Sequence, residues 1–173
     1  KHEIEAYQHF VDKENINEFI KNHVNSKNIG ILSIDIDGND YWIWDVISVV
    51  NPDILVIEYN SIFGSSRSVT LKYNENFIRP NRGIYKCLYG ASLSALTKLS
   101  EKKGYSLVAT NLNGNNAFYV RNQLLNEKVY KKDHQVCFKQ NSFKEFLDEK
   151  GELKYLDENN IKELLNNENL VEV

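Results

Sequence analysis

The sequence predicts an α/β fold in which a mostly parallel sheet ends in an antiparallel hairpin. Two apolar runs, residues 29–34 and 53–57, each end in acidic residues, and a segment with helical periodicity separates them. Parallel strands that are buried on both faces have this continuous apolar character. Further along, Asn113-Gly114 lies between two apolar segments, which is a strong signal for a hairpin.

The chain begins with a predicted strand and a predicted helix. Residues Glu3–Val11 alternate weakly between polar and apolar side chains, which favours a strand. Residues 12–15 supply helix-start chemistry, and the apolar side chains of residues 16–24 then fall on one helical face.

A strand, helix, strand unit follows. Residues 41–50 carry apolar and aromatic side chains with the i, i+3, i+4 spacing of an amphipathic helix, between the apolar runs 29–34 and 53–57. In open α/β sheets, ligands bind beyond the carboxyl ends of the strands. The polar residues that follow the two runs therefore form a candidate site.

Residues 61–89 form a long connection that is rich in aromatic side chains and in breakers of regular structure. Such a connection inside a compact domain is more often a functional loop or lid than a linker. Residues 69–73 are predicted as a short strand within it. A serine-capped helix at residues 92–104 and the hairpin of residues 105–121 complete the sheet region.

We expect two parts, a sheet domain at residues 1–121 and a charged helical C-terminal appendage at residues 122–173. In the appendage the segments SFKEFLDEK and NIKELLNN are predicted as short amphipathic helices. The appendage is expected to pack loosely or to mediate contacts.

Composition excludes several function classes. The net charge of -3 and the pI near 5.8 argue against a nucleic-acid partner. Cys87 and Cys137 lack the spacing of a metal site or a disulfide framework. Because the chain has no long apolar run, a cytoplasmic protein without a membrane partner is expected.

The chain has no methionine and opens on Lys1, so we expect further sequence before it.

Four segments carry a resemblance to a known family. LSIDIDGNDYWIW, PDILVIEYN, YGASLSALTKLSEKKGYSLV and NGNNAFYVR resemble, in this order, the second half of FkbM-type and related class I methyltransferases. The resemblance covers residues 29–121 and implies a Rossmann-like methyltransferase sheet. It also implies transfer of a methyl group from S-adenosylmethionine to a hydroxyl or similar nucleophile of a small molecule or glycan.

The resemblance also implies that part of the family's fold is absent. Residues 3–11 match the third strand of the family, residues 30–35 the fourth and residues 54–58 the fifth, with the hairpin as the last two. The first strands, with the glycine-rich cofactor loop and the acidic ribose-binding residue, are expected before Lys1.

Asp37 and Glu58 are the predicted catalytic residues. Asp35 and Asp37 stand two apart after the first run, so on a strand both side chains point the same way, and Gly38 lets the chain turn. Paired carboxylates can hold a cofactor amine, bind a divalent cation or act as a base. The resemblance implies that Asp35 and Asp37 contact the cofactor. Mg²⁺ is the lesser alternative, because Glu58-Tyr59-Asn60 stands where metal-dependent O-methyltransferases have Asp-Asn.

The predicted acceptor-binding residues are polar or aromatic and follow the strands or open a helix. They are Asn39, Tyr59, Asn60, Tyr89, Ser92 and Asn116. Tyr89 is the best candidate, because a helix N-terminus that favours an anionic or polar group begins just after it. The alternatives are that Asn39 or Asp40 caps the following helix and that Asn116 belongs to a turn.

Two other function classes stay open. One is a non-catalytic binding module that retains part of the methyltransferase fold. The other is a divalent-metal-dependent hydrolase or phosphoryl-transfer enzyme built on the acidic strand ends. The expected partner is a small-molecule or glycan acceptor, and a homo-oligomer is possible. The histidines show no metal spacing, so no metal-ligating set is predicted.

Overall fold

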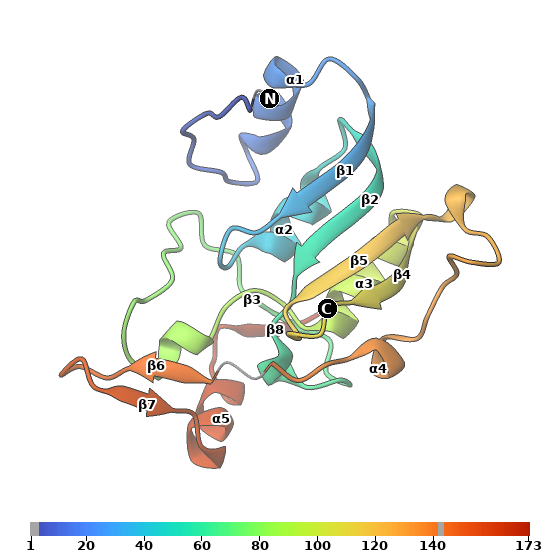
Figure 1. The fold of residues 1–173 in the computed structure, drawn as a ribbon. Coiled ribbons are helices and arrows are strands. Elements are labelled where there is room, and N and C mark those ends of the chain that lie inside the picture. The colour runs from blue at the N-terminus through green and yellow to red at the C-terminus, as the bar shows by residue number, and fades with distance from the viewer. Residues whose placement is uncertain (1–3, 142–143) are drawn as a thin grey trace.

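The computed structural model of the chain describes residues 4–141 and 144–173. At its centre is a four-stranded sheet of order β1-β2-β5-β4 (Figure 1). β1 (Asn28–Ile34) runs parallel to β2 (Asn51–Glu58). β5 (Asn116–Arg121) lies antiparallel both to β2 and to β4 (Tyr105–Thr110).

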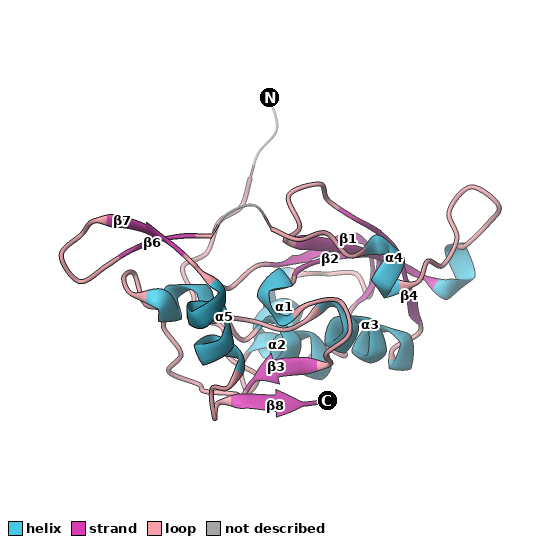
Figure 2. Cartoon of the chain, turned by 90° about the horizontal axis from the view of Figure 1, so that it is seen from below, coloured by secondary structure: helices cyan, strands magenta, loops and turns pink. Residues whose placement is uncertain are grey.

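Helices pack on one face of this sheet. α2 (Asp40–Val46) and α3 (Leu93–Lys102) lie beneath β1 and β2 in the view of Figure 2. α1 (Ile16–His23) joins the same apolar cluster through Ile16 and Ile20. α1 and α3 begin and end close to where hydrophobic periodicity predicts them, whereas α2 ends at Val46, four residues before the end of the predicted segment 41–50.

The prediction of a mostly parallel, Rossmann-like methyltransferase sheet is wrong. Of the three pairings in the described sheet, β1 with β2 alone is parallel. Residues 4–11 form no strand, and Glu3 lies outside the described residues. Instead of pairing with β1, Tyr7 and His9 pack their rings against Phe19 of the first helix, with centroids 6.3 and 4.4 Å away. Local aromatic packing therefore outweighs the weak strand pattern of this segment.

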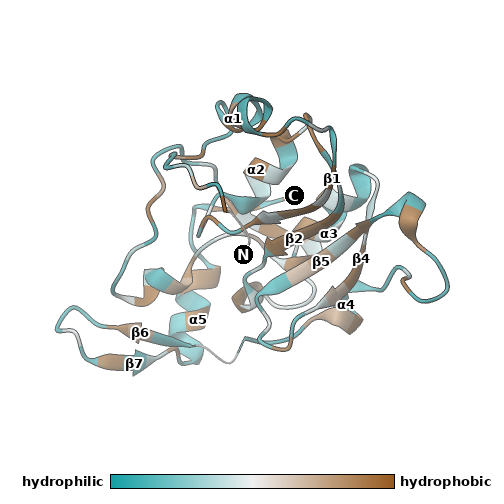
Figure 3. Ribbon diagram, turned by 45° about the horizontal axis from the view of Figure 1, so that its top comes forward, coloured by the Kyte–Doolittle hydropathy of each residue, from teal (hydrophilic) through white to brown (hydrophobic). Residues whose placement is uncertain are grey.

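The core lies between the sheet and the helices. Because side chains alternate along a strand, Leu55 and Ile57 of β2 and Ala117 and Tyr119 of β5 face the helices and are fully buried. On the opposite face, Ile31 of β1 keeps 63% of its surface exposed. Figure 3 shows the apolar character of β1 and β2.

The hairpin of β4 and β5 forms where Asn113-Gly114 predicts it. Gly114 has a φ of 74°, a backbone conformation that glycine adopts without steric cost. The side-chain oxygen of Asn111 accepts hydrogen bonds from the backbone N–H groups of Gly114, Asn115 and Asn116. Turn chemistry thus explains the asparagine-rich segment.

A second apolar cluster connects the long loop to the C-terminal region. β3 (Val69–Leu71) pairs with β8 (Leu170–Glu172). Leu164 of α5 (Glu158–Leu165) is fully buried in the cluster that contains Phe63. The last strand of the chain is therefore part of the fold that surrounds the loop.

The segment SFKEFLDEK is not a helix in its described part. β6 (Glu145–Leu147) forms a hairpin with β7 (Leu153–Tyr155). The Asp148 carboxylate accepts two backbone N–H groups of the turn, and Gly151 has a φ of 82°. This turn chemistry favours a hairpin over the predicted helix.

The remaining elements are short. α4 (His134–Cys137) packs near α3 and β4. The 3-10 helices are Ser61–Phe63, Ile84–Cys87 and Asn122–Leu124. No helix in residues 4–141 and 144–173 has the length and apolar character needed to cross a membrane.

Candidate functional site

Residues 35–40, the acidic turn after β1, do not have the geometry that the sequence predicts. The strand ends at Ile34, and Asp37 has a φ of 61°, in the left-handed region that aspartate tolerates better than most residues. Strand alternation therefore does not relate Asp35 to Asp37, and that part of the prediction is wrong. Both side chains are exposed at the carboxyl end of β1.

The buried side chain of Asp40 stabilises this turn through hydrogen bonds to its backbone. Its carboxylate is fully buried and accepts hydrogen bonds from the backbone N–H groups of Ile36 at 3.1 Å and Gly38 at 2.9 Å. Burial raises the pKa of Asp40, and these hydrogen bonds oppose the shift. Asn39 occupies the N-cap position of α2, but its side chain donates to the carbonyl of Asn74 at 2.9 Å and makes no cap hydrogen bond.

Glu58 ends β2 and has a buried carboxyl oxygen without a partner. Among the described residues, nothing lies within hydrogen-bonding geometry of its Oε2. Burial, followed by the negative charges of Asp35 and Asp40, raises the pKa of Glu58 to about 7, and the positive charge of Arg79 opposes the shift. A carboxyl group that titrates near neutral pH is suited to act as a general base or acid.

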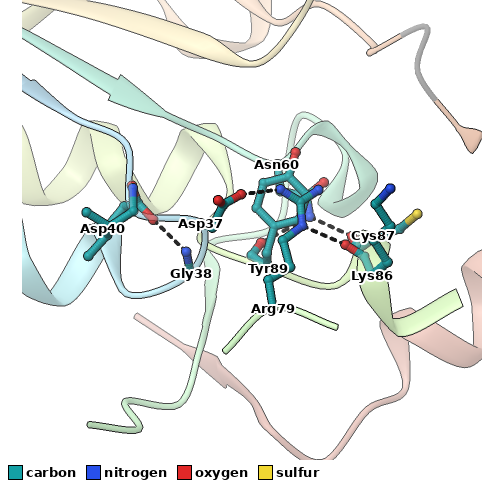
Figure 4. Close-up of polar contacts among 9 residues, drawn as sticks. Asp37, Gly38, Asp40, Asn60, Arg79, Lys86, Cys87 and Tyr89 are labelled. Atoms are coloured by element: carbon teal, nitrogen blue, oxygen red, sulfur yellow. Dashed lines mark hydrogen bonds and ion pairs between the residues drawn. The ribbon is translucent and has the colours of Figure 1, made fainter. Parts of the chain in front are cut away.

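Arg79 connects the acidic turn to the long loop (Figure 4). It forms an ion pair with Asp37, and its Nε donates to the carbonyl of Lys86 at 2.8 Å. Its guanidinium group lies 3.7 Å from the centroid of the Tyr89 ring, a cation–π contact. Three contacts of different kinds therefore fix the position of this cation.

A cavity of about 290 Å³ lies beside Arg79 and Tyr89. Its polar lining includes Asn60, Arg79, Lys86, Tyr89, Lys144 and Glu145. The Asn60 side chain is nearly buried and donates to the carbonyls of Cys87 at 2.9 Å and Tyr89 at 3.0 Å. Asn60 thus holds the loop against the end of β2 and shapes one wall of the cavity.

The structure brings part of the predicted set together. Asn60 and Tyr89 both line the cavity. Burial raises the pKa of Tyr89, and the negative charge of Glu58 raises it further. Asn116 lies opposite Glu58 in the register between β2 and β5.

The other predicted acceptor residues have structural partners. Tyr59 is fully buried, and its hydroxyl donates to the carbonyl of Lys139 at 2.9 Å. Ser92 is also fully buried, and its Oγ accepts from the backbone N–H groups of Ala95 and Val69, each at 3.1 Å. Neither residue is among those that line the cavity.

Sequence reasoning missed the three cations of the cavity. Arg79 and Lys86 belong to the aperiodic loop, and Lys144 comes from the C-terminal region. No spacing signal relates these residues, because tertiary contacts bring their segments together. The one signal that pointed to the loop was its length and its aromatic content.

Within the described residues, no group of three or more His, Cys, Asp or Glu side chains is placed to hold a metal ion. Comparisons of the chain with models of known families, with curated proteins and with solved structures found no match.

Proposed function

We propose that the chain takes part in S-adenosylmethionine-dependent methyl transfer to a hydroxyl group, with Glu58 as the general base. The observation that carries this proposal is the buried, unpaired Oε2 of Glu58 at the carboxyl end of β2. Leaving a buried acceptor without a hydrogen bond costs about 1–3 kcal/mol, so such an atom is uncommon unless a water, an ion or a ligand completes it.

Glu58 has the properties that proton removal from a hydroxyl requires. Because its pKa lies at about 7, a large share of the group is ionised at neutral pH, yet the carboxylate is basic enough to accept a proton. Arg79 lowers the pKa and so preserves the ionised share. Asp37 is less suited to this role, since Arg79 already pairs with its carboxylate.

The charges at this end of the sheet fit the proposed cofactor. S-adenosylmethionine supplies an electrophilic methyl group on a positively charged sulfonium, which negative side chains stabilise. Asp35 is exposed and has no hydrogen bond or ion pair within the described residues, so its carboxylate is free to accept from an amine or a hydroxyl. Of the two predicted cofactor residues, Asp35 is therefore the better candidate, because Asp37 is paired with Arg79.

The resemblance to FkbM-type methyltransferases supports methyl transfer over other base-catalysed reactions. Two of its four segments, LSIDIDGNDYWIW and PDILVIEYN, contain Asp35 and Glu58. This support depends on the residues of the two segments and not on the pairing of the strands.

Calorimetric titration with S-adenosylhomocysteine, with and without Mg²⁺, tests the cofactor assignment. We expect saturable binding without the metal. The Asp35→Asn variant should bind about fivefold more weakly, because it loses a charge-assisted hydrogen bond. Glu127→Gln, which alters an exposed carboxylate far from the acidic turn in sequence, is the control and should bind normally. Absence of binding would contradict the assignment, and strict dependence on Mg²⁺ would favour metal chemistry.

Transfer of a radiolabelled methyl group to a panel of small hydroxy compounds tests the base. Loss of a general base lowers a rate by about 10²–10⁴-fold, so Glu58→Gln should lose nearly all transfer while Glu127→Gln keeps it. For the unaltered chain, the rate should rise with pH through about 7, as Glu58 becomes ionised. Full activity of Glu58→Gln would exclude the proposed role.

A further inference from the structure

We infer that the cavity beside Arg79 binds a phosphate group of the acceptor, so that the acceptor is a small phosphorylated hydroxy compound. The inference rests on the proposed function for the position of the reacting hydroxyl. The anion site itself rests on separate observations of the cavity.

The first observation is the charge of the cavity wall. Three cations, Arg79, Lys86 and Lys144, and one acid, Glu145, line it, and Asp37 already pairs with Arg79, so the formal charge that remains is three minus two, or +1. The chain as a whole has a net charge of -3. A positive cavity in a negative protein concentrates anions locally.

The second observation is that two of these cations lack a counter-ion. In the part of the chain that the structure describes, Lys86 and Lys144 form no ion pair, although both are half-buried. Lys131 and Lys154, by contrast, each contact a carboxylate at 2.7 Å. An ammonium group that is partly removed from water is stabilised by an anionic partner.

The third observation is that the guanidinium group at the cavity is already fixed in place. Tyr89 stacks on Arg79, and the carbonyl of Lys86 accepts from its Nε. An anion that binds there loses little free energy to ordering of the side chain. A fixed guanidinium group and two lysines that line the same cavity suit a dianion with several acceptor oxygens better than a single carboxylate.

The size and position of the cavity restrict the ligand further. Its volume of about 290 Å³ fits a compound of the size of a sugar phosphate. Arg79 and Tyr89 line the cavity and also interact electrostatically with Glu58. Glu58 itself is not among the residues that line the cavity, so a ligand with its phosphate among the cations would present its hydroxyl to Glu58 past Arg79 and Tyr89.

Titration with inorganic phosphate, followed by amide chemical shifts in NMR spectra, tests this inference. We expect saturable shifts at residues of the cavity, with Kd in the range of about 1–10 mM that a small isolated anion reaches. The double variant Lys86→Gln/Lys144→Gln should bind at least about fivefold more weakly. The matched double variant Lys21→Gln/Lys128→Gln removes the same charge from exposed positions and should bind as the unaltered chain does.

Further arms of the experiment distinguish the outcomes. Shifts without saturation, or equal weakening in both double variants, would overturn the inference, and so would acetate binding as tightly as phosphate. Thermal unfolding of each variant checks that it is folded. If the unaltered chain binds S-adenosylhomocysteine but not phosphate, the anion site alone is overturned. The reverse result overturns the proposed cofactor and leaves the anion site.

Discussion

At the scale of single residues, Glu58 lies at the carboxyl end of β2, in surroundings that disfavour the ionised form of its carboxyl group. Its buried Oε2 has no hydrogen-bond partner within the described residues, and the negative charges of Asp35 and Asp40 oppose its ionisation. Groups whose pKa is shifted by burial and by specific charged neighbours cluster at functional sites. The same features reduce the stability of the folded chain, which gives a test that needs no substrate.

The pH dependence of unfolding should report Glu58. Since its pKa in the folded state is about 7, above the ordinary value of 4.5, the folded state holds the extra proton between these pH values. The contribution of Glu58 to the free energy of unfolding is therefore fully present below pH 4.5 and is lost as pH rises through 7. Allowing for solvent screening, the loss is about 1–2 kcal/mol.

Chemical denaturation of the Glu58→Gln variant measures this loss. Above pH 7 the variant should exceed the unaltered chain in free energy of unfolding, because it removes the ionisation step. Glu127→Gln, at an exposed position, should follow the profile of the unaltered chain. If Glu58→Gln and the unaltered chain show parallel profiles from pH 4.5 to 8, the raised pKa is refuted.

Gly38 is restricted by the ring of Phe77. A Cβ atom at Gly38 would lie 2.1 Å from that ring, so Gly38→Ala must displace Phe77 and the loop that contains Arg79. Overpacking of this kind costs about 1–3 kcal/mol. Gly30→Ala is the control, because nothing lies within 4 Å of the Cβ position there. Equal free energies of unfolding for the two variants would contradict this contact.

At the scale of elements, the start of α3 depends on Ser92. Its buried Oγ accepts two backbone N–H groups, those of Ala95 and Val69, and so joins the helix to β3. Ser92→Ala should lower the free energy of unfolding by about 1–2 kcal/mol. Ser94→Ala, within the same helix, removes a hydroxyl that does not cap and should cost less. If Ser94→Ala lowered the free energy of unfolding more than Ser92→Ala, the capping role of Ser92 would be excluded.

Elements with a strong local signal could be predicted from the sequence. The periodic helices and the Asn113-Gly114 hairpin follow from side-chain spacing and turn chemistry. The helix predicted for SFKEFLDEK is wrong, because the apolar residues Phe146 and Leu147 satisfy both a helical and a strand pattern. The turn from Asp148 to Gly151 was the signal that distinguishes them.

At the scale of the whole molecule, the C-terminal region supports the loop around the cavity. Leu164 is fully buried beside the loop, so Leu164→Ala should lower the free energy of unfolding by about 2–4 kcal/mol. Leu153→Ala, at a residue with 56% of its surface exposed, should change it by less than about 0.5 kcal/mol. A small effect of Leu164→Ala would mean that the region does not stabilise the fold.

The candidate site shows which part of function is readable from sequence. The acids at the ends of β1 and β2 could be predicted, because apolar runs mark the strands and the residues after them are adjacent in sequence. Arg79 and Lys144 could not, since they reach the site through loop and tail contacts that no periodic pattern records. The sequence also does not predict that most strand pairings in the described sheet are antiparallel, because strand order depends on long-range pairing.

An NMR titration of the Glu58 carboxyl carbon tests the central claim most directly. Selective ¹³C labelling of glutamate, with Glu58→Gln to assign the signal, gives its pKa in the folded chain. The structure predicts a value of about 7, and Arg79→Gln should raise it further by removing the nearby positive charge. A pKa near the ordinary 4.5 would contradict the proposal that Glu58 is a base prepared by its surroundings.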